Sequence, residues 1–303
     1  MEGFFWWVFD ALLVIVIAWV VFANARKGMT KVLVMCIGYI VATLAASVLS
    51  AVAAPTMYEV FVQESNINAI VQVNKEVDIT ECLCEILKDQ NYGIEIEQGR
   101  IQTFLLPPDT DKFDQNIYNY VNAKCGYQVS SLMDFKKMLT NEFAERYGEA
   151  LGNHLPYYAE VNFRRQMTSD PATIHTMFTE FYSMYSTELD NAAYVQETFV
   201  KDTTIHLFQM FTYVVIFSVV MVFAALFSKL LQYSLIFNVK KTTDHLLGAV
   251  IGIIEAAVMV LLMTLVIRLI VVLCGGELMC FNEETIQATR LFKYLYNHTD
   301  LLL

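Results

Sequence analysis

Residues 4–23 read FFWWVFDALLVIVIAWVVFA, and residues 246–274 read LLGAVIGIIEAAVMVLLMTLVIRLIVVLC. Each run is long enough to cross the hydrocarbon core of a bilayer as a helix, which takes roughly 20 mostly apolar residues. Two further runs, 32–54 and 206–228, meet the same requirement. The sequence therefore predicts a mainly α integral membrane protein with four spanning helices arranged as two hairpins.

The segment between the two hairpins is different in character. Residues 56–204 hold 23 acidic and 11 basic side chains, and their apolar residues recur at helical spacing. We expect a mostly helical inserted domain there, with Ile94–Glu97 as a candidate short strand. The predicted domains are a first transmembrane hairpin (1–55), an acidic extracytoplasmic helical insertion (56–204), a second transmembrane hairpin (205–275) and a C-terminal tail with a short helix (276–303).

Within the insertion, the helical apolar spacing is clearest in three runs: 66–89, 133–151 and 171–202. Ser169-Asp170-Pro171 is a helix-start signal, and no Gly or Pro separates Ala192 from the third span. We therefore expect the last helix of the insertion to run straight into that span, starting at Pro171 or at Ala192.

The composition of the whole chain agrees with a membrane protein. Of 303 residues, 56% are hydrophobic and 17% are charged, whereas a soluble domain is closer to a quarter charged. The net charge of −11 argues against a nucleic-acid partner, because phosphate binding needs a basic surface. The lipid bilayer is the partner that the composition predicts.

The short loops predict the orientation. The first hairpin tip carries Arg26, Lys27 and Lys31 without an acid, and lysines outnumber acids in the second tip, 229–245. Because short basic loops stay in the cytoplasm, both tips are expected inside, and the N-terminus, the insertion and the C-terminus outside. The apolar stretch 230–239 is too short to span, so it either lies along the inner surface or extends the third span.

Three charged residues fall inside the predicted spans: Asp10, Glu255 and Arg268. Asp10 and Arg268 each lie about six residues from the outer end of a span, roughly 9 Å deep. We hypothesise that they pair, since an unpaired ion in lipid is costly; alternatively Arg268 snorkels outward alone. Glu255 lies deeper in its span. It is either a functional carboxyl in a polar cavity or a protonated group packed among its neighbours.

Gly248 and Gly252 share one helical face, and such spacing lets helices approach closely. The contact could be with another span of the same chain or with another copy in a homo-oligomer. A disulfide is an option outside the cytosol, from Cys125 to Cys82 or Cys84, or from Cys274 to Cys280. The sequence shows none of the motifs for hydrolase triads, phosphate loops or zinc proteases, so no catalytic residue, metal or cofactor is predicted.

Two stretches resemble the colicin V production protein family. The first is Phe9-Asp10 followed by Arg26-Lys27-Gly28-Met29; the second runs from Thr243-Asp244-His245 through Gly248 to Gly252. The resemblance covers residues 4–54 and about 205–300, and the insertion is absent from short family members. It implies a bacterial cytoplasmic-membrane protein linked to colicin V-like toxin production or export and to envelope homeostasis, without enzymatic activity.

Three functions compete at this stage. The first is a non-enzymatic membrane protein of this family, with the extracytoplasmic domain binding an unknown partner. The second is an oligomeric transporter or channel subunit that uses Asp10, Glu255 and Arg268. The third, a membrane enzyme, would depend on acids of the insertion: Glu95, Glu97, Asp109 and Asp111.

Overall fold

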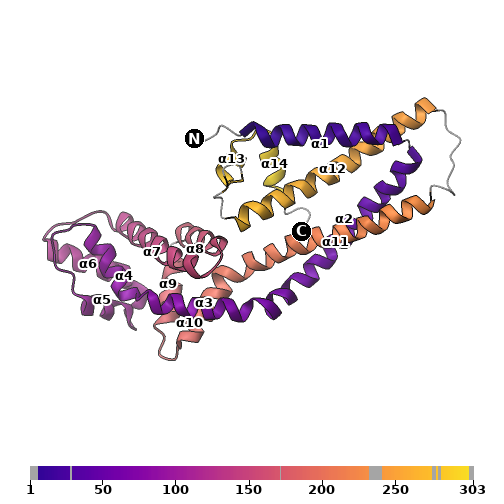
Figure 1. Ribbon diagram of the computed structural model, residues 1–303. Coiled ribbons are helices and arrows are strands. Elements are labelled where there is room, and N and C mark those ends of the chain that lie inside the picture. Colours follow the sequence, from indigo (N-terminus) through magenta and orange to yellow (C-terminus); the bar gives the residue numbers. More distant parts are fainter. Residues whose placement is uncertain are drawn as a thin grey trace. The chain divides into compact units, whose positions relative to one another are not determined.

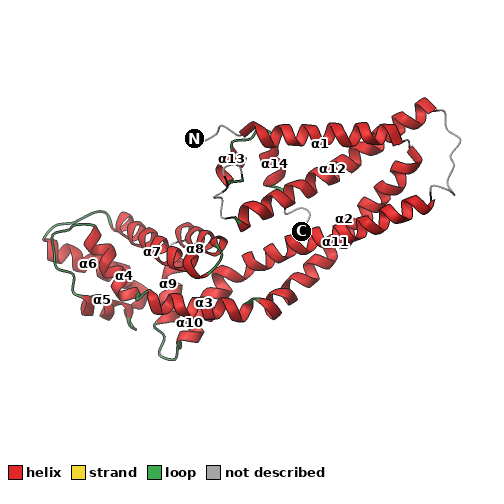
Figure 2. Cartoon of the chain, in the orientation of Figure 1, coloured by secondary structure: helices red, strands yellow, loops and turns green. Residues whose placement is uncertain are grey.

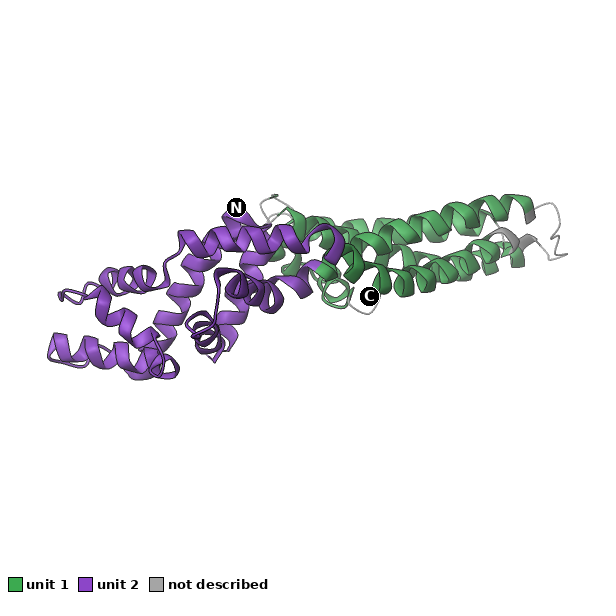
Figure 3. Ribbon diagram, turned by 90° about the horizontal axis from the view of Figure 1, so that it is seen from below, with its two compact units in different colours: residues 1–58, 205–303 green, residues 59–204 purple. Residues whose placement is uncertain are grey.

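The computed structural model describes residues 6–27, 29–170, 172–231, 241–274, 278 and 281–299. These residues are mostly helical and include no strand (Figure 2), which confirms the mainly α prediction. The chain forms two compact units, residues 1–58 with 205–303 and residues 59–204 (Figure 3). We call the first the membrane unit and the second the inserted unit.

Four helices of the described chain are long and apolar enough to cross a membrane, which confirms the four predicted spans. They include α1 (Trp6–Lys27), α2 (Met29–Phe61), α11 (Lys201–Leu231) and α12 (Lys241–Leu273). A helix satisfies its backbone hydrogen bonds internally, which is what an apolar solvent requires. The helices are longer than the apolar runs: α2 has 33 residues, or about 50 Å. Most of the predicted surface stretch 230–239 lies outside the described residues.

Each spanning helix packs along a helix of the other hairpin. In Figure 1, α1 lies beside α12 and α2 lies beside α11. The α2–α11 contact is close at Gly38, where an added Cβ would lie only 2.7 Å from the Cβ of Ala224. The rings of Tyr39 and Phe217 also meet across it, with centroids 6.1 Å apart. The two hairpins are therefore interlocked, with the first span paired to the fourth and the second to the third.

Two short helices follow the last span, α13 (Glu283–Gln287) and α14 (Phe292–Tyr296). They pack on α1 and α12 in a buried cluster to which Phe9, Val271 and Phe292 belong. The ring of Phe9 stacks on that of Phe292, with centroids 5.1 Å apart and planes at 18°. The tail is thus part of the core of the membrane unit.

The inserted unit is built from helices. Their bounds are α3 (Gln63–Glu76), α4 (Ile79–Asp89), α5 (Gln98–Leu105), the 3₁₀ turn η1 (Thr110–Lys112), α6 (Phe113–Cys125), α7 (Leu132–His154), α8 (Tyr157–Ser169), α9 (Ala172–Phe181), α10 (Glu188–Val195) and the π turn η2 (Gln196–Val200). Buried aromatic rings join them. Phe143 lies 5.0 Å from Phe178, and Phe163 lies 4.8 Å from Phe199, between ring centroids.

Two local predictions were wrong in detail. The helical run 66–89 is broken before Asp78, whose carboxylate accepts a hydrogen bond from the backbone N–H of Glu81 at 3.0 Å and starts α4. Ile94–Glu97 is a loop rather than a strand. It lies between Gly93, which has a positive φ of 72°, and the start of α5, so it is too short to pair with a second strand.

The last helix of the insertion does run into the third span. It starts at Glu188, where Thr187 and Asp190 form a reciprocal capping box, and continues through η2 into α11. The run 172–202 is interrupted after Phe181, and Pro171 lies outside the described residues. A π turn displaces backbone carbonyls from their usual partners, and here the Phe199 carbonyl accepts the side-chain amide of Asn162 at 2.5 Å.

The five described cysteines, Cys36, Cys82, Cys84, Cys125 and Cys274, all have free thiols. The bridge from Cys125 to Cys82 or Cys84 is therefore not formed. Cys82 and Cys84 lie on the buried face of α4, and burial raises the pKa of the Cys82 thiol to about 11. The second option involves Cys280, which lies outside the described residues.

A buried carboxylate joins three helices of the inserted unit. Asp114 on α6 accepts hydrogen bonds from Nε2 of His175 on α9 at 2.9 Å and from Nζ of Lys136 on α7 at 3.0 Å. Burial by itself raises the pKa of Asp114, but the two cationic or polar donors outweigh it and hold the pKa below its ordinary value. The ionised form therefore stabilises the fold.

We predict that Asp114→Asn weakens this junction by about 1.5–3 kcal/mol, the value of hydrogen bonds to a charged group. Amide hydrogen exchange of the full chain in detergent should show loss of protection in α6, α7 and α9. Because the folded-state pKa is lowered, the contribution is complete above the ordinary pKa and is lost as pH falls through the folded-state value. The exposed Asp109→Asn is the control; equal protection in both variants would contradict the prediction.

Candidate functional site: polar contacts within the membrane unit

The intramembrane charges lie near opposite ends of α1. Asp10 is in the first turns of that helix, and Arg268 is near the corresponding end of α12. Glu255 instead contacts Asn24, three residues before the last residue of α1. The membrane unit therefore has two separate polar sites, one at the hairpin tips and one at the tail.

The tip-side site centres on Glu255, which is only 6% exposed. Its Oε2 accepts a hydrogen bond from Nδ2 of Asn24 at 2.7 Å. The hydroxyl of Tyr39 and the thiol of Cys36, both on α2, lie within electrostatic reach of the carboxyl. One side chain on α12 thus interacts with both helices of the first hairpin.

Asn24 links this buried carboxyl to a surface cation. Its Oδ1 accepts a hydrogen bond from Nζ of Lys27 at 3.1 Å, while its Nδ2 donates to Glu255. Lys27 is exposed at the end of α1. The ammonium and the carboxyl are therefore connected through one amide, which donates to Glu255 and accepts from Lys27.

Two adjacent residues of α12 hold the turn of the first hairpin. Oδ1 of Asp244 accepts a hydrogen bond from the backbone N–H of Met29, the first residue of α2, at 2.8 Å. Nδ1 of His245 donates to the carbonyl of Ala25, near the end of α1, at 2.7 Å. The first N–H groups and the last carbonyl groups of a helix have no partner within the helix. The Asp244 carboxylate satisfies one such N–H group of α2, and the His245 ring N–H satisfies one such carbonyl of α1. Gly28, between these two helix ends, lies outside the described residues.

Gly252 lies where α12 and α1 approach closely. An added Cβ there would lie 2.9 Å from the Cβ of Asn24 and 3.4 Å from the Cα of Val21. Gly248, one turn earlier, is also buried. The partner of Gly252 is thus a span of the same chain, in line with the first of the two alternatives that the sequence offered.

At the tail-side site, Asp10 binds backbone rather than a cation. Its two carboxylate oxygens accept hydrogen bonds from the N–H groups of Arg290, Leu291 and Phe292, at 2.8, 3.0 and 2.8 Å. Arg268 donates through Nη1 to the hydroxyl of Thr299. The hypothesised ion pair between Asp10 and Arg268 is not among the contacts of the described residues.

The reason for this difference is that the tail supplies better-placed partners. Three backbone N–H groups donate to the Asp10 carboxylate, and hydrogen bonds to an ionised acceptor are stronger than those between neutral groups. Arg268 also lies 5.9 Å from the ring centroid of Tyr296, a cation–π distance. No pattern in the sequence indicated that residues 290–299 fold back onto the spans.

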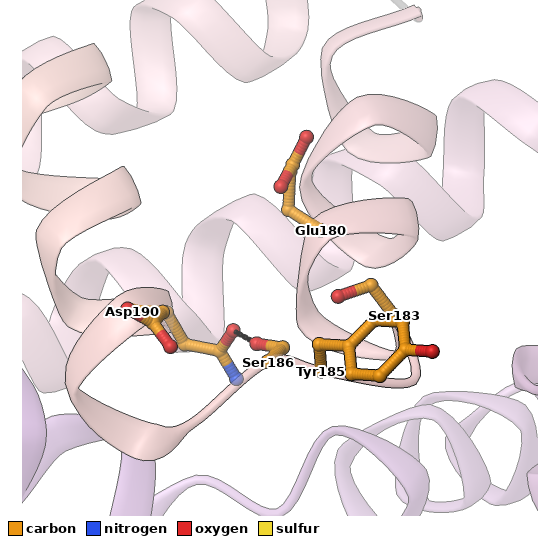
Figure 4. A pocket seen from close by; sticks show the side chains of 6 residues that line it. Glu180, Ser183, Tyr185, Ser186 and Asp190 are labelled. Carbon is orange, nitrogen blue, oxygen red and sulfur yellow. Dashed lines mark hydrogen bonds between the residues drawn. The ribbon is translucent and has the colours of Figure 1, made fainter.

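The inserted unit has a small polar pocket between α9 and α10 (Figure 4). It is lined by Glu180, Ser183, Tyr185, Ser186, Asp190 and Asn191. The Ser186 hydroxyl bonds to Asn191, and Asp190 is held by the capping box, so both groups already have structural partners. None of the acids considered for an enzyme lines this pocket.

Those acids have separate neighbours. Glu97 forms an ion pair with Lys124 at 2.5 Å, and Asp111 accepts a bond from Thr179 at 3.4 Å. Among the described residues, no group of three His, Cys, Asp or Glu side chains is arranged to hold a metal ion.

We predict that Gly252→Val separates α12 from α1, because the new side chain meets the Asn24 side chain and the α1 backbone. Overpacking of this kind costs about 1–3 kcal/mol or more. The detergent-solubilised chain should lose heat stability and accumulate to a lower level in membranes. Gly99→Val is the matched control, since nothing lies within 4 Å of an added Cβ there; equal loss in both variants would refute the role of Gly252.

Searches of curated proteins and of solved structures returned no match. The model of one family, described as Colicin V production protein, matches residues 183–300. The matched segment includes Asp244, Gly252, Glu255, Arg268 and the tail, whereas the first hairpin lies outside it. The second hairpin and tail of this membrane protein are thus similar to the colicin V production protein family, as the stretch from Thr243 to Gly252 predicted.

Proposed function

We propose that this multi-pass membrane protein supports the production or export of a colicin V-like toxin, or envelope homeostasis, without catalysing a reaction. The observation that carries the proposal is the family match over residues 183–300, which contains the second hairpin and the tail. A role in assembly or binding agrees with the polar groups of the spans, because their described partners are other parts of the same fold.

We further propose that both hairpin tips face the cytoplasm of a bacterial cell and that the inserted unit lies outside. Arg26 and Lys27 end α1, and Lys229 lies near the end of α11, so the described helices carry cations at the tip side. Short basic loops favour the cytoplasmic side. The acidic inserted unit would then present its surface to an extracytoplasmic partner.

A second candidate, an oligomeric transporter or channel subunit, is favoured by one observation: a buried Glu255 reached from Lys27 through Asn24. The other two charges weigh against it. Asp10 and Arg268 are bonded to the tail near the opposite end of α1, so the three residues do not line one route. We therefore rank the non-transporting role first.

Glu255→Gln separates these two functions. Glutamine keeps an oxygen that can accept the Asn24 amide, so a scaffold should retain its fold and its activity within about twofold. A strain lacking the gene and complemented with this variant should secrete toxin and resist envelope stress like the complemented parent. If secretion falls more than tenfold at equal protein level, and ion flux in proteoliposomes falls with it, the transporter is the better description.

The extracytoplasmic partner can be sought by crosslinking in native membranes followed by affinity capture. The comparison is between the full chain and a chain in which residues 56–204 are removed, with both required to reach the membrane at similar levels. We expect one or more adducts that need the inserted unit. Identical adduct patterns from both chains would contradict a binding role for that unit.

A further inference from the structure

We propose that the tail segment, residues 281–299, lies at the interfacial edge of the bilayer, where Leu291 and Tyr294 contact lipid in the leaflet that surrounds the start of α1. The sequence led us to expect a tail outside the membrane. The packing of the tail against α1 and α12 leads to a different placement. The inference concerns how the chain sits in the membrane and does not depend on the proposed function.

The first argument is depth. Asp10 is four residues after Trp6, or about 6 Å along the axis of α1, inside a helix that is apolar enough to span. The backbone of residues 290–292 bonds directly to its carboxylate. The start of α14 therefore lies level with the second turn of α1 rather than beyond its end.

The buried cluster extends this depth. Ile286, Phe292 and Tyr296 of the tail belong to one cluster with Leu13 of α1 and Val260 of α12. Leu13 is seven residues after Trp6, or about 10 Å along the helix axis. Tail side chains therefore reach the apolar level of both spans, which a surface-bound tail would not do.

The second argument is polar satisfaction. A short helix leaves its first N–H groups without partners, and lipid offers none. Asp10 accepts the N–H groups of Arg290, Leu291 and Phe292, at and just before the start of α14, and the N–H of Lys293 donates to Oγ1 of Thr289 at 2.9 Å. Tyr296 donates its hydroxyl to Glu283 at 3.0 Å, and the buried Thr299 accepts from Arg268. These backbone and side-chain groups of the tail therefore have partners within the chain.

The third argument is the surface that remains. Leu291 is 55% exposed and Tyr294 is 63% exposed in the isolated chain. Trp7 on α1 and Leu273 on α12, both near the same end of their helices, are exposed as well. Exposed apolar side chains are therefore found on the tail as well as on the neighbouring ends of the spans. Lipid, which must cover the spans, is the occupant that this distribution favours.

The charged residues of the tail fit an interfacial edge. The guanidinium of Arg290 lies 5.3 Å from a ring centroid of Trp6, and Nζ of Lys293 lies 5.5 Å from that of Tyr294. Tryptophan and tyrosine favour the membrane–water interface, and long cationic side chains extend from apolar positions toward the headgroups. Both cations can thus extend toward the headgroups.

The test is the reactivity of Tyr294→Cys toward a membrane-impermeant maleimide in opened native membranes, read by site-resolved mass spectrometry. Tyr185→Cys, at a position 91% exposed in the inserted unit, is the control for an accessible thiol. We expect the thiol at 294 to react at least tenfold more slowly, and both thiols to react equally in denaturing detergent. Reaction at 294 within twofold of that at 185 would overturn the placement.

The role of Asp10 in holding the tail against α1 is tested in the chain that carries Tyr294→Cys. Asp10→Asn removes the carboxylate that accepts three N–H groups and should raise labelling at position 294 at least fivefold. Asp244→Asn removes a comparable backbone-binding carboxylate from the opposite end of α1 and should leave that labelling unchanged. Equal effects of the two substitutions would argue against Asp10 as the anchor and for general unfolding.

The occupant is identified by placing a photoactivatable benzoylphenylalanine at position 294. Adducts to phospholipid after irradiation support lipid contact. Adducts that join two copies of the chain, without lipid adducts, would overturn it and assign this surface to an oligomer interface.

Discussion

A helix inside a bilayer forms hydrogen bonds with all of its own backbone groups except those at its ends, and lipid tails offer no hydrogen-bond partners to these end groups. In this membrane unit two aspartates bind helix starts that are distant in sequence. Asp244 accepts the first N–H of α2, 215 residues earlier, and Asp10 accepts the N–H groups that open α14, about 280 residues later. The arrangement of the two hairpins and the tail depends on these bonds, because each bond joins elements that are far apart in the sequence.

Glu255 extends the same principle to a side chain. Its carboxyl is enclosed by the amide of Asn24 and lies within reach of Tyr39, and Gly252 lets α1 come close enough for the bond to form. A larger residue at 252 would move the donor away from the acceptor. The close packing at Gly252 is therefore needed for the Asn24–Glu255 hydrogen bond, and a polar group without a partner at this depth in the membrane is costly.

The sequence predicted what depends on composition and period. Four apolar runs of sufficient length required four spans, and helical spacing in 56–204 required a helical insertion. It also singled out Asp10, Asp244, Gly252 and Glu255 as residues of interest. It could not predict their partners, because a pattern along the chain carries no information on which span packs beside which.

The differences between the expected and the described contacts have the same origin. Asp10 and Arg268 were paired on charge and estimated depth, while the competing acceptors and donors belonged to a tail whose short helices show little periodicity. Likewise, Ile94–Glu97 alternates like a strand, but the described residues include no second strand for it to pair with, and its sequence alone does not reveal that. Local patterns were reliable for elements and unreliable for the contacts between elements.

The pairing of first span with fourth has a consequence for biosynthesis. When α1 and α2 enter the membrane, the helix that packs on α1 and the residues that cap α2 have not yet been made, and more than 140 residues of the inserted unit separate the hairpins. The first hairpin must therefore wait in lipid with its polar residues, Asp10 and Asn24, lacking their final partners. Chains that stop before residue 241 would lack these partners, because Glu255, which accepts from Asn24, and the backbone that binds Asp10 both lie in residues 241–303.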